Sequence, residues 1–168
     1  MAAFIVTPSR AAQLGEKPQY TPVTDATSES RSCPKGRTPP RRIGTYFGSP
    51  SYDQLYFVEL DANDVVHVFG QTRALGDYWI QNAAYGTPES GMLVAKFTND
   101  LNGLDWSTVV GTGSGRPNLS PTAFLVDNCG LVYLSGWGGS TNVASNPTGT
   151  DTVDDMPTTP DAYQSSTD

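Results

Sequence analysis

Residues 55–70 read LYFVELDANDVVHVFG, and a related stretch, PTAFLVDNCGLVYLSG, follows 66 positions later at residues 121–136. Each copy has the pattern of a strand, a four-residue polar turn and a second strand that ends in glycine. Three identities lie at equivalent positions: Asp61 with Asp127, Val66 with Val132, and Gly70 with Gly136. The repeat therefore predicts two copies of one antiparallel hairpin.

Short β-rich runs separated by turn residues continue on both sides of the first copy. They predict strands at 44–48, 92–98 and 104–110, and the last two flank a turn that contains Asn102-Gly103, a dipeptide typical of hairpins. Seven expected strands with no helical segment between them indicate an all-β antiparallel meander. The 17 Gly and 13 Pro also disfavour helix.

The repeating unit has four expected strands, at 55–60, 65–70, 92–98 and 104–110. Four antiparallel strands per repeat are typical of a β-propeller blade. We therefore expect one complete blade at about 55–110, with 44–48 as the last strand of the preceding blade and 122–168 as a partial following blade. The third strand of that partial blade is expected just past Asp168, so the chain is interpreted as a fragment of a larger propeller.

Three segments of the chain resemble a known family: VAKFTNDLNGLDWSTVVG at 94–111, AFLVDNCGLVYLSGW at 123–137 and TTPDAYQSS at 158–166. They resemble the SBBP-type repeats, seven-bladed β-propeller repeats of secreted bacterial surface proteins that include gliding-motility-associated ones. The resemblance covers roughly 43–168, and nothing in 1–42 matches. It implies export and surface display or adhesion.

Charge is distributed unevenly along the chain. Residues 1–42 hold seven of the ten Lys and Arg and three of the 17 acids, so residues from 43 onward carry a net charge of −11. Such an acidic body repels phosphate backbones, and we expect no nucleic-acid partner. Residues 1–42 are interpreted as an irregular Pro-, Ser- and Arg-rich lead-in, either a solvated linker or an electrostatic tether to an acidic surface.

The chain shows no apolar run of 18 residues, so no membrane span is predicted. Its start, MAAFIVTPSR, lacks the basic segment and the apolar length of a secretory signal. Either the protein is intracellular or its true N-terminus lies outside this chain; a secreted or surface location needs the second. Cys33 and Cys129 fit no metal pattern and are either one disulfide or two unpaired thiols.

The long connections of an antiparallel meander are expected at one end, where a ligand site is most plausible. The 71–91 connection offers aromatic rings beside polar groups, a combination that suits a sugar face. Its candidate ligand-binding residues are Arg73, Asp77, Tyr78, Trp79 and Tyr85. The alternative is that its aromatic residues pack inward and anchor the loop.

The short turns offer further candidates. The run from Thr98 to Trp106 is similar to the Asp-box turn of sialidase-type propellers, which implies structural roles for Asp100, Asn102, Gly103 and Trp106. Asp127, Gly70 and Gly136 are likewise expected to be structural. Asp61, Asn63 and Asp64 are either calcium ligands or residues whose side chains cap the turn. No other cofactor is expected.

The sequence contains no recognisable set of catalytic residues. His67 is the only histidine and occupies the repeat position of Tyr133, which favours packing over general-base chemistry. The glycine run at 111–116 lacks a following helix and is interpreted as a crossover. We expect a non-enzymatic segment for adhesion, protein contact or display. A carbohydrate-binding or glycoside-processing propeller that uses the 71–91 loop and a purely architectural spacer are the alternatives, and exposed strand edges predict self-association of the isolated fragment.

Overall fold

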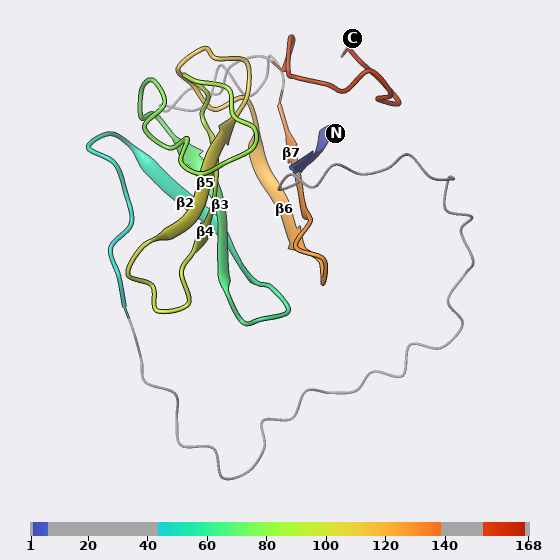
Figure 1. Ribbon diagram of the computed structural model, residues 1–168. Coiled ribbons are helices and arrows are strands. Elements are labelled where there is room, and N and C mark those ends of the chain that lie inside the picture. The colour runs from blue at the N-terminus through green and yellow to red at the C-terminus, as the bar shows by residue number, and fades with distance from the viewer. Residues whose placement is uncertain (1, 7–43, 139–152, 167–168) are drawn as a thin grey trace, which may run out of the picture. The chain divides into compact units, whose positions relative to one another are not determined.

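The computed structural model describes residues 2–6, 44–138 and 153–166. These residues form antiparallel β-structure and contain no helix (Figure 1). The strands are β1 (Ala2–Val6), β2 (Asp53–Leu60), β3 (Val66–Thr72), β4 (Met92–Phe97), β5 (Leu104–Val110), β6 (Ser120–Val126) and β7 (Val132–Trp137). The all-β expectation is confirmed for this part of the chain.

The first sheet is the four-stranded meander β2-β3-β4-β5, in which each strand pairs with the next along the chain. The expected unit at 55–110 is therefore one antiparallel sheet. β3, β4 and β5 bury most of their residues because alternate side chains supply apolar groups to both faces, whereas the edge strand β2 has no fully buried residue. Along β4, for example, Met92 and Val94 enter one core cluster, whereas Leu93 and Ala95 enter clusters on the other side.

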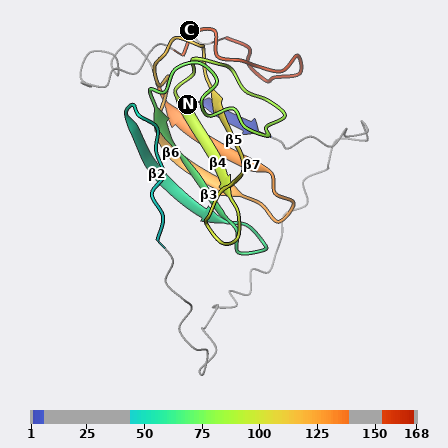
Figure 2. The ribbon, with the colours of Figure 1, turned by 60° about the vertical axis from the view of Figure 1, so that its left-hand side comes forward.

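The second sheet has the order β1-β7-β6. The hairpin β6-β7 is the second copy of the repeat, and it contacts β2 and β3 (Figure 2). The expectation of an irregular lead-in throughout 1–42 is wrong for its first residues, because Ala2–Val6 form β1 and pair antiparallel with β7. A five-residue apolar run becomes a strand only where a sheet edge is available to it, and that edge is remote in sequence. Residues 7–42 lie outside the described residues.

One core joins the two sheets. Phe69 of β3 stacks on Phe124 of β6 with ring centroids 5.6 Å apart, and Phe57 and Trp106 pack around them. We call the surfaces that meet here the contact faces; their buried residues include Phe69, Met92 and Val94 of the first sheet and Phe124, Val126, Val132 and Leu134 of the second. A buried amide adds a polar link, since Gln71 Nε2 donates to the Leu119 carbonyl at 2.7 Å.

The opposite side of the first sheet, its open face, is covered in part by chain that is not in the sheet. Phe47 packs against Trp79 and Phe97, with ring centroids 4.6 and 5.2 Å apart. The expected strand at 44–48 is not formed, and residues 44–49 have no ladder partner. A strand needs a neighbour to satisfy its backbone groups, and here the segment contributes a packing side chain instead.

A bulge recurs at the same place in both hairpins. The β2-β3 register shifts between Leu55 and Phe57, and the β6-β7 register shifts between Pro121 and Ala123. The expected structural glycines lie opposite these shifts. A Cβ on Gly70 would lie 2.2 Å from the Gln54 carbonyl oxygen, and one on Gly136 would lie 2.8 Å from the Leu119 Cβ. The close approach of the bulged strand therefore requires glycine.

Candidate functional site

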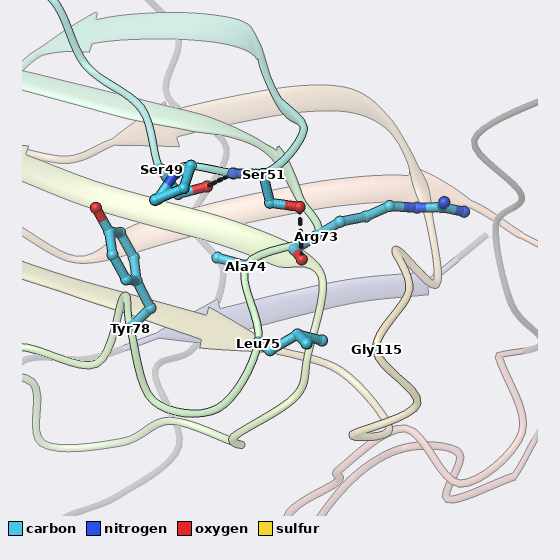
Figure 3. A pocket seen from close by; sticks show the side chains of 8 residues that line it. Ser49, Ser51, Arg73, Ala74, Leu75, Tyr78 and Gly115 are labelled. Carbon is cyan, nitrogen blue, oxygen red and sulfur yellow. Dashed lines mark hydrogen bonds between the residues drawn. The ribbon is translucent and has the colours of Figure 1, made fainter.

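Three long connections meet at one end of the first sheet, as expected. Backbone hydrogen bonds join Arg73 to Tyr52, Glu89 to Gly76 and Gly115 to Glu89. Between these connections lies an open depression of about 510 Å³ (Figure 3). It is lined by Ser49, Pro50, Ser51, Arg73, Ala74, Leu75, Tyr78 and Gly115.

The depression brings together two of the five residues proposed for ligand binding. Tyr78 is 45% exposed, and the Arg73 carbonyl accepts a hydrogen bond from Ser51 Oγ at 2.9 Å. In Figure 3 the Arg73 side chain extends away from the Tyr78 ring, so the two do not form a clamp. Asp77 and Tyr85 are exposed but do not line the depression.

Trp79 is the clearest departure from the ligand hypothesis, because its side chain is only 4% exposed. Its ring packs in the cluster of Leu93 and Val109, and Nε1 donates to Thr72 Oγ1 at 3.1 Å. A sugar therefore has no access to its face, and the assignment of Trp79 as a ligand residue is wrong. The anchoring alternative holds for Trp79. A long loop with no core of its own is stabilised most by burial of its largest apolar side chain.

Thr72 is a positioning residue that the sequence did not single out. Its hydroxyl donates to Asp53 Oδ1 at 2.6 Å and accepts from Trp79 Nε1 and from the Ala74 amide. Asp53 Oδ2 accepts in turn from the Ser49 hydroxyl at 2.7 Å. A threonine that ends a strand gives no sequence signal for this role, because its partners come from the neighbouring strand β2 and from the connection that follows β3.

The acids near the depression have structural partners. Glu89 Oε1 accepts from the Gly76 amide at 2.7 Å, and both Asp53 oxygens accept from hydroxyl groups. These bonds hold the loops in place. They bring no pair of acids together across the depression, whose lining residues include neither Asp nor Glu.

The Asp61 turn shows what its oxygens do. Oδ1 accepts from the amides of Asn63 and Val65 at 2.8 and 3.1 Å, and Oδ2 lies 3.3 Å from His67 Nε2 and 3.4 Å from Lys96 Nζ. Asn63 and Asp64 are exposed. The Asx-capping alternative describes these contacts, and a lysine beside the carboxylate opposes calcium at Asp61. Within the described residues, no group of three or more His, Cys, Asp or Glu is arranged to hold a metal ion.

The pKa values of Asp61 and His67 are both lowered at this turn, for different reasons. Burial by itself raises the pKa of Asp61, but the amides of Val65 and Asn63, His67 and the charge of Lys96 outweigh it and lower that pKa to about 2. Burial, with a contribution from Lys96, lowers the pKa of His67. His67 Nδ1 is buried and makes no hydrogen bond, and its ring meets Trp106 edge-on at 6.0 Å. Both features fit the expected packing role.

The second copy of the repeat has a turn of the same kind at Asp127. Asp127 Oδ1 accepts from the amides of Cys129 and Leu131 at 2.8 and 2.9 Å, and the Tyr133 hydroxyl donates to Oδ2 at 3.3 Å. The structural role expected of Asp127 is therefore capping of its own turn. Cys129 is an exposed free cysteine in the structure. Cys33 lies outside the described residues, so a pairing of the two stays a prediction.

The Thr98–Gly103 turn is held by Asp100, in the manner that the Asp-box resemblance implies. Asp100 Oδ1 accepts from the Thr98 hydroxyl at 2.7 Å, and Asn102 Nδ2 donates to Oδ2 at 2.9 Å; the hydrogen bond from Thr98 is the main cause that lowers the pKa of Asp100. Trp106 packs against the core between the sheets. The turn is not a tight Asn-Gly hairpin, because its positive φ, 57°, belongs to Leu101.

The glycine run at 111–116 is a crossover between the sheets. Buried Asn118 braces it, since Asn118 Oδ1 accepts from the Thr112 amide at 3.1 Å and Nδ2 donates to the Thr112 hydroxyl at 2.9 Å. A Cβ on Gly111 would lie 2.3 Å from that amide oxygen. Gly111 thus allows close packing, whereas Gly113 and Gly115 adopt positive φ values of 77° and 75°.

Comparisons of the chain with protein-family models, with curated proteins and with solved structures find no match. The resemblance to SBBP-type repeats therefore stays an expectation. Within the described residues, no helix has the length and apolar character needed to cross a lipid bilayer.

Proposed function

We propose that the chain is a non-enzymatic repeat segment of β-propeller type, secreted or displayed at a cell surface, whose long connections contact another protein. The observation that carries the proposal is the repetition itself. Two hairpins 66 residues apart share a bulge, a glycine opposite the bulge and an aspartate-capped turn, and they pack face to face. Successive propeller blades pack in this way.

Protein contact is favoured over catalysis by the groups at the long-connection end. Exposed apolar side chains, Leu75 at 70% and Tyr78 at 45%, stand beside hydroxyls and carbonyls, which is the composition of a recognition surface. The nearby acids Asp53 and Glu89 hold loops.

Adhesion tests this proposal. Beads coated with the full chain should adhere to protein-coated surfaces more strongly than beads coated with a variant in which Leu75 and Tyr78 are both serine. The control replaces Tyr46, which is 105% exposed and does not line the depression, with serine. Equal adhesion of wild type and the double variant would remove the proposal and favour the architectural spacer.

The depression itself favours one second candidate, carbohydrate binding, because an exposed tyrosine and an arginine share its rim. On a glycan array, Tyr78→Ala and Arg73→Ala should each abolish a hit that Tyr46→Ala leaves intact. A hit that survives both substitutions, or no hit at all, would exclude this candidate. Trp79→Ala is unsuitable for the test because Trp79 belongs to the core.

A further inference from the structure

Both sheets leave an apolar patch on the side that faces away from their shared core. On the open face of the first sheet, Val58 and Leu60 of β2 are 65% and 54% exposed. On the opposite side of the second sheet, which we call its open face, Leu125 of β6 and Tyr133 and Trp137 of β7 are 55%, 36% and 48% exposed. Strand alternation places each set on one face.

The repeat shows how the first patch is covered when a neighbour is present. Val58 and Leu60 occupy the repeat positions of Phe124 and Val126. In the second sheet those two residues are only 7% and 8% exposed, because the contact face of the first sheet covers them. The open face of the first sheet is therefore equivalent to a surface that is buried elsewhere in the same molecule.

The residues of the second patch are equivalent to residues that are buried in the first sheet. Tyr133 and Trp137 occupy the repeat positions of His67 and Gln71, each of which is 1% exposed on the contact face of the first sheet. Leu125 corresponds to Glu59 and is the more apolar of the pair. The open face of the second sheet is thus equivalent to a surface that a following sheet covers.

We propose that a second copy of this chain docks head to tail, so that the open face of the second sheet in one copy covers the open face of the first sheet in the next. This contact reproduces between molecules the packing that already joins the two sheets within one molecule. The two surfaces are different, so the contact is heterologous and leaves one patch exposed at each end. Addition of further copies makes a ring or an open chain.

Docking through faces differs from pairing through strand edges, and it goes beyond the proposed function because it requires no loop and no ligand. Burial of apolar side chains is the driving force, and the five residues named on the open faces are uncharged. The chain carries a net charge of −7, so copies repel one another at low ionic strength. Association is therefore expected to strengthen as salt is added.

The experiment uses the full chain and two variants, Val58→Lys and Leu125→Lys. Both sites are more than half exposed, so the substitutions spare the core. Sedimentation velocity across a concentration series should show the wild type forming dimers and higher species, and each variant alone should associate at least about tenfold more weakly. An equimolar mixture of the two should form a one-to-one dimer and nothing larger, because each variant retains the face that the other has lost.

The control is Tyr163→Lys, which places the same charge on a residue that is 104% exposed and lies outside both sheets; it should associate like the wild type. Circular dichroism of every variant should match the wild type. A monomeric wild type at all concentrations would overturn the proposal. Variants that associate normally would indicate edge pairing, and a mixture that stays monomeric would exclude the head-to-tail arrangement.

Discussion

The carboxylate of Asp61 lies 3.3 Å from the imidazole of His67, whose side chain is 2% exposed. Lys96 Nζ lies 3.4 Å from the same carboxylate oxygen and 3.6 Å from Asp105. One acid thus caps a turn, contacts the ring of a buried strand residue and attracts a cation from the neighbouring strand. Stability should depend on pH through this arrangement.

His67 should make the fold less stable as the pH falls below neutrality. Burial lowers its pKa below the ordinary value of 6.5, so the unfolded chain takes up the proton before the folded chain does. The free energy of unfolding should therefore fall as the pH is lowered through 6.5, by at most about 1.4 kcal/mol per pH unit from this group. Urea unfolding at pH 7.5, 6.5 and 5.5 measures it. His67→Gln should remove this part of the slope, and identical slopes for both proteins would contradict the assignment.

Asp61 should make a separate contribution in acid. Its pKa is lowered from 3.8 to about 2, so its contribution is present above pH 3.8 and is lost as the pH falls toward 2. Asp61→Ala should cost about 2–3 kcal/mol at pH 7, because it leaves two amides and a buried ring without their acceptor. Asp127→Ala should cost about 1 kcal/mol, since the Tyr133 ring beside that turn is exposed. Equal losses in urea unfolding would argue against a special role for the His67 contact.

The repeated glycines should be sensitive to a single methyl group. Gly70→Ala and Gly136→Ala force a Cβ against the bulged strand, where overpacking costs about 1–3 kcal/mol or more. Gly103→Ala is the matched control. Its Cβ would come no closer than 3.9 Å to Thr98, and its φ is not positive, so thermal unfolding should be nearly unchanged. A Gly103→Ala variant as unstable as the other two would mean that glycine is needed for backbone flexibility.

Trp79 should contribute to stability through both its ring and its N–H group. Trp79→Phe keeps a ring beside Phe47 but leaves Thr72 without its indole donor, and should cost about 1 kcal/mol plus a packing term. Trp79→Ala should cost about 3–5 kcal/mol. Tyr78→Ala, on the exposed neighbour, should cost less than about 0.5 kcal/mol. A Trp79→Ala variant with wild-type stability would return Trp79 to the candidate ligand residues.

Much of the strand structure was predictable because it depends on local properties. The strand expected at 104–110 coincides with β5, and the second hairpin copy expected at 121–136 ends within one residue of the end of β7, since apolar runs and turn residues bound them closely. The candidate ligand site was predicted less well. Trp79 and Tyr78 are adjacent in sequence and look alike as candidates, yet one is 4% and the other 45% exposed.

Other differences between the expected and the observed structure also depend on tertiary packing. The strand expected at 44–48 did not form and the strand at Ala2–Val6 did, because strand formation depends on which sheet edge is free. The sequence does not reveal the roles of Thr72 and Gln71, since their partners are remote in sequence. Buried polar groups acquire such roles from packing, which no local pattern encodes.

The repeat, the antiparallel hairpins and the aspartate-capped turns follow from the sequence, because strand alternation and turn hydrogen bonds involve residues that are close along the chain. Which copy of a repeated position is buried depends instead on the tertiary packing. Phe124 is covered by Phe69, whereas Val58, at the equivalent position, is exposed. Burial is a property of the surface that lies opposite a residue, and that surface comes from elsewhere in the chain or from another molecule.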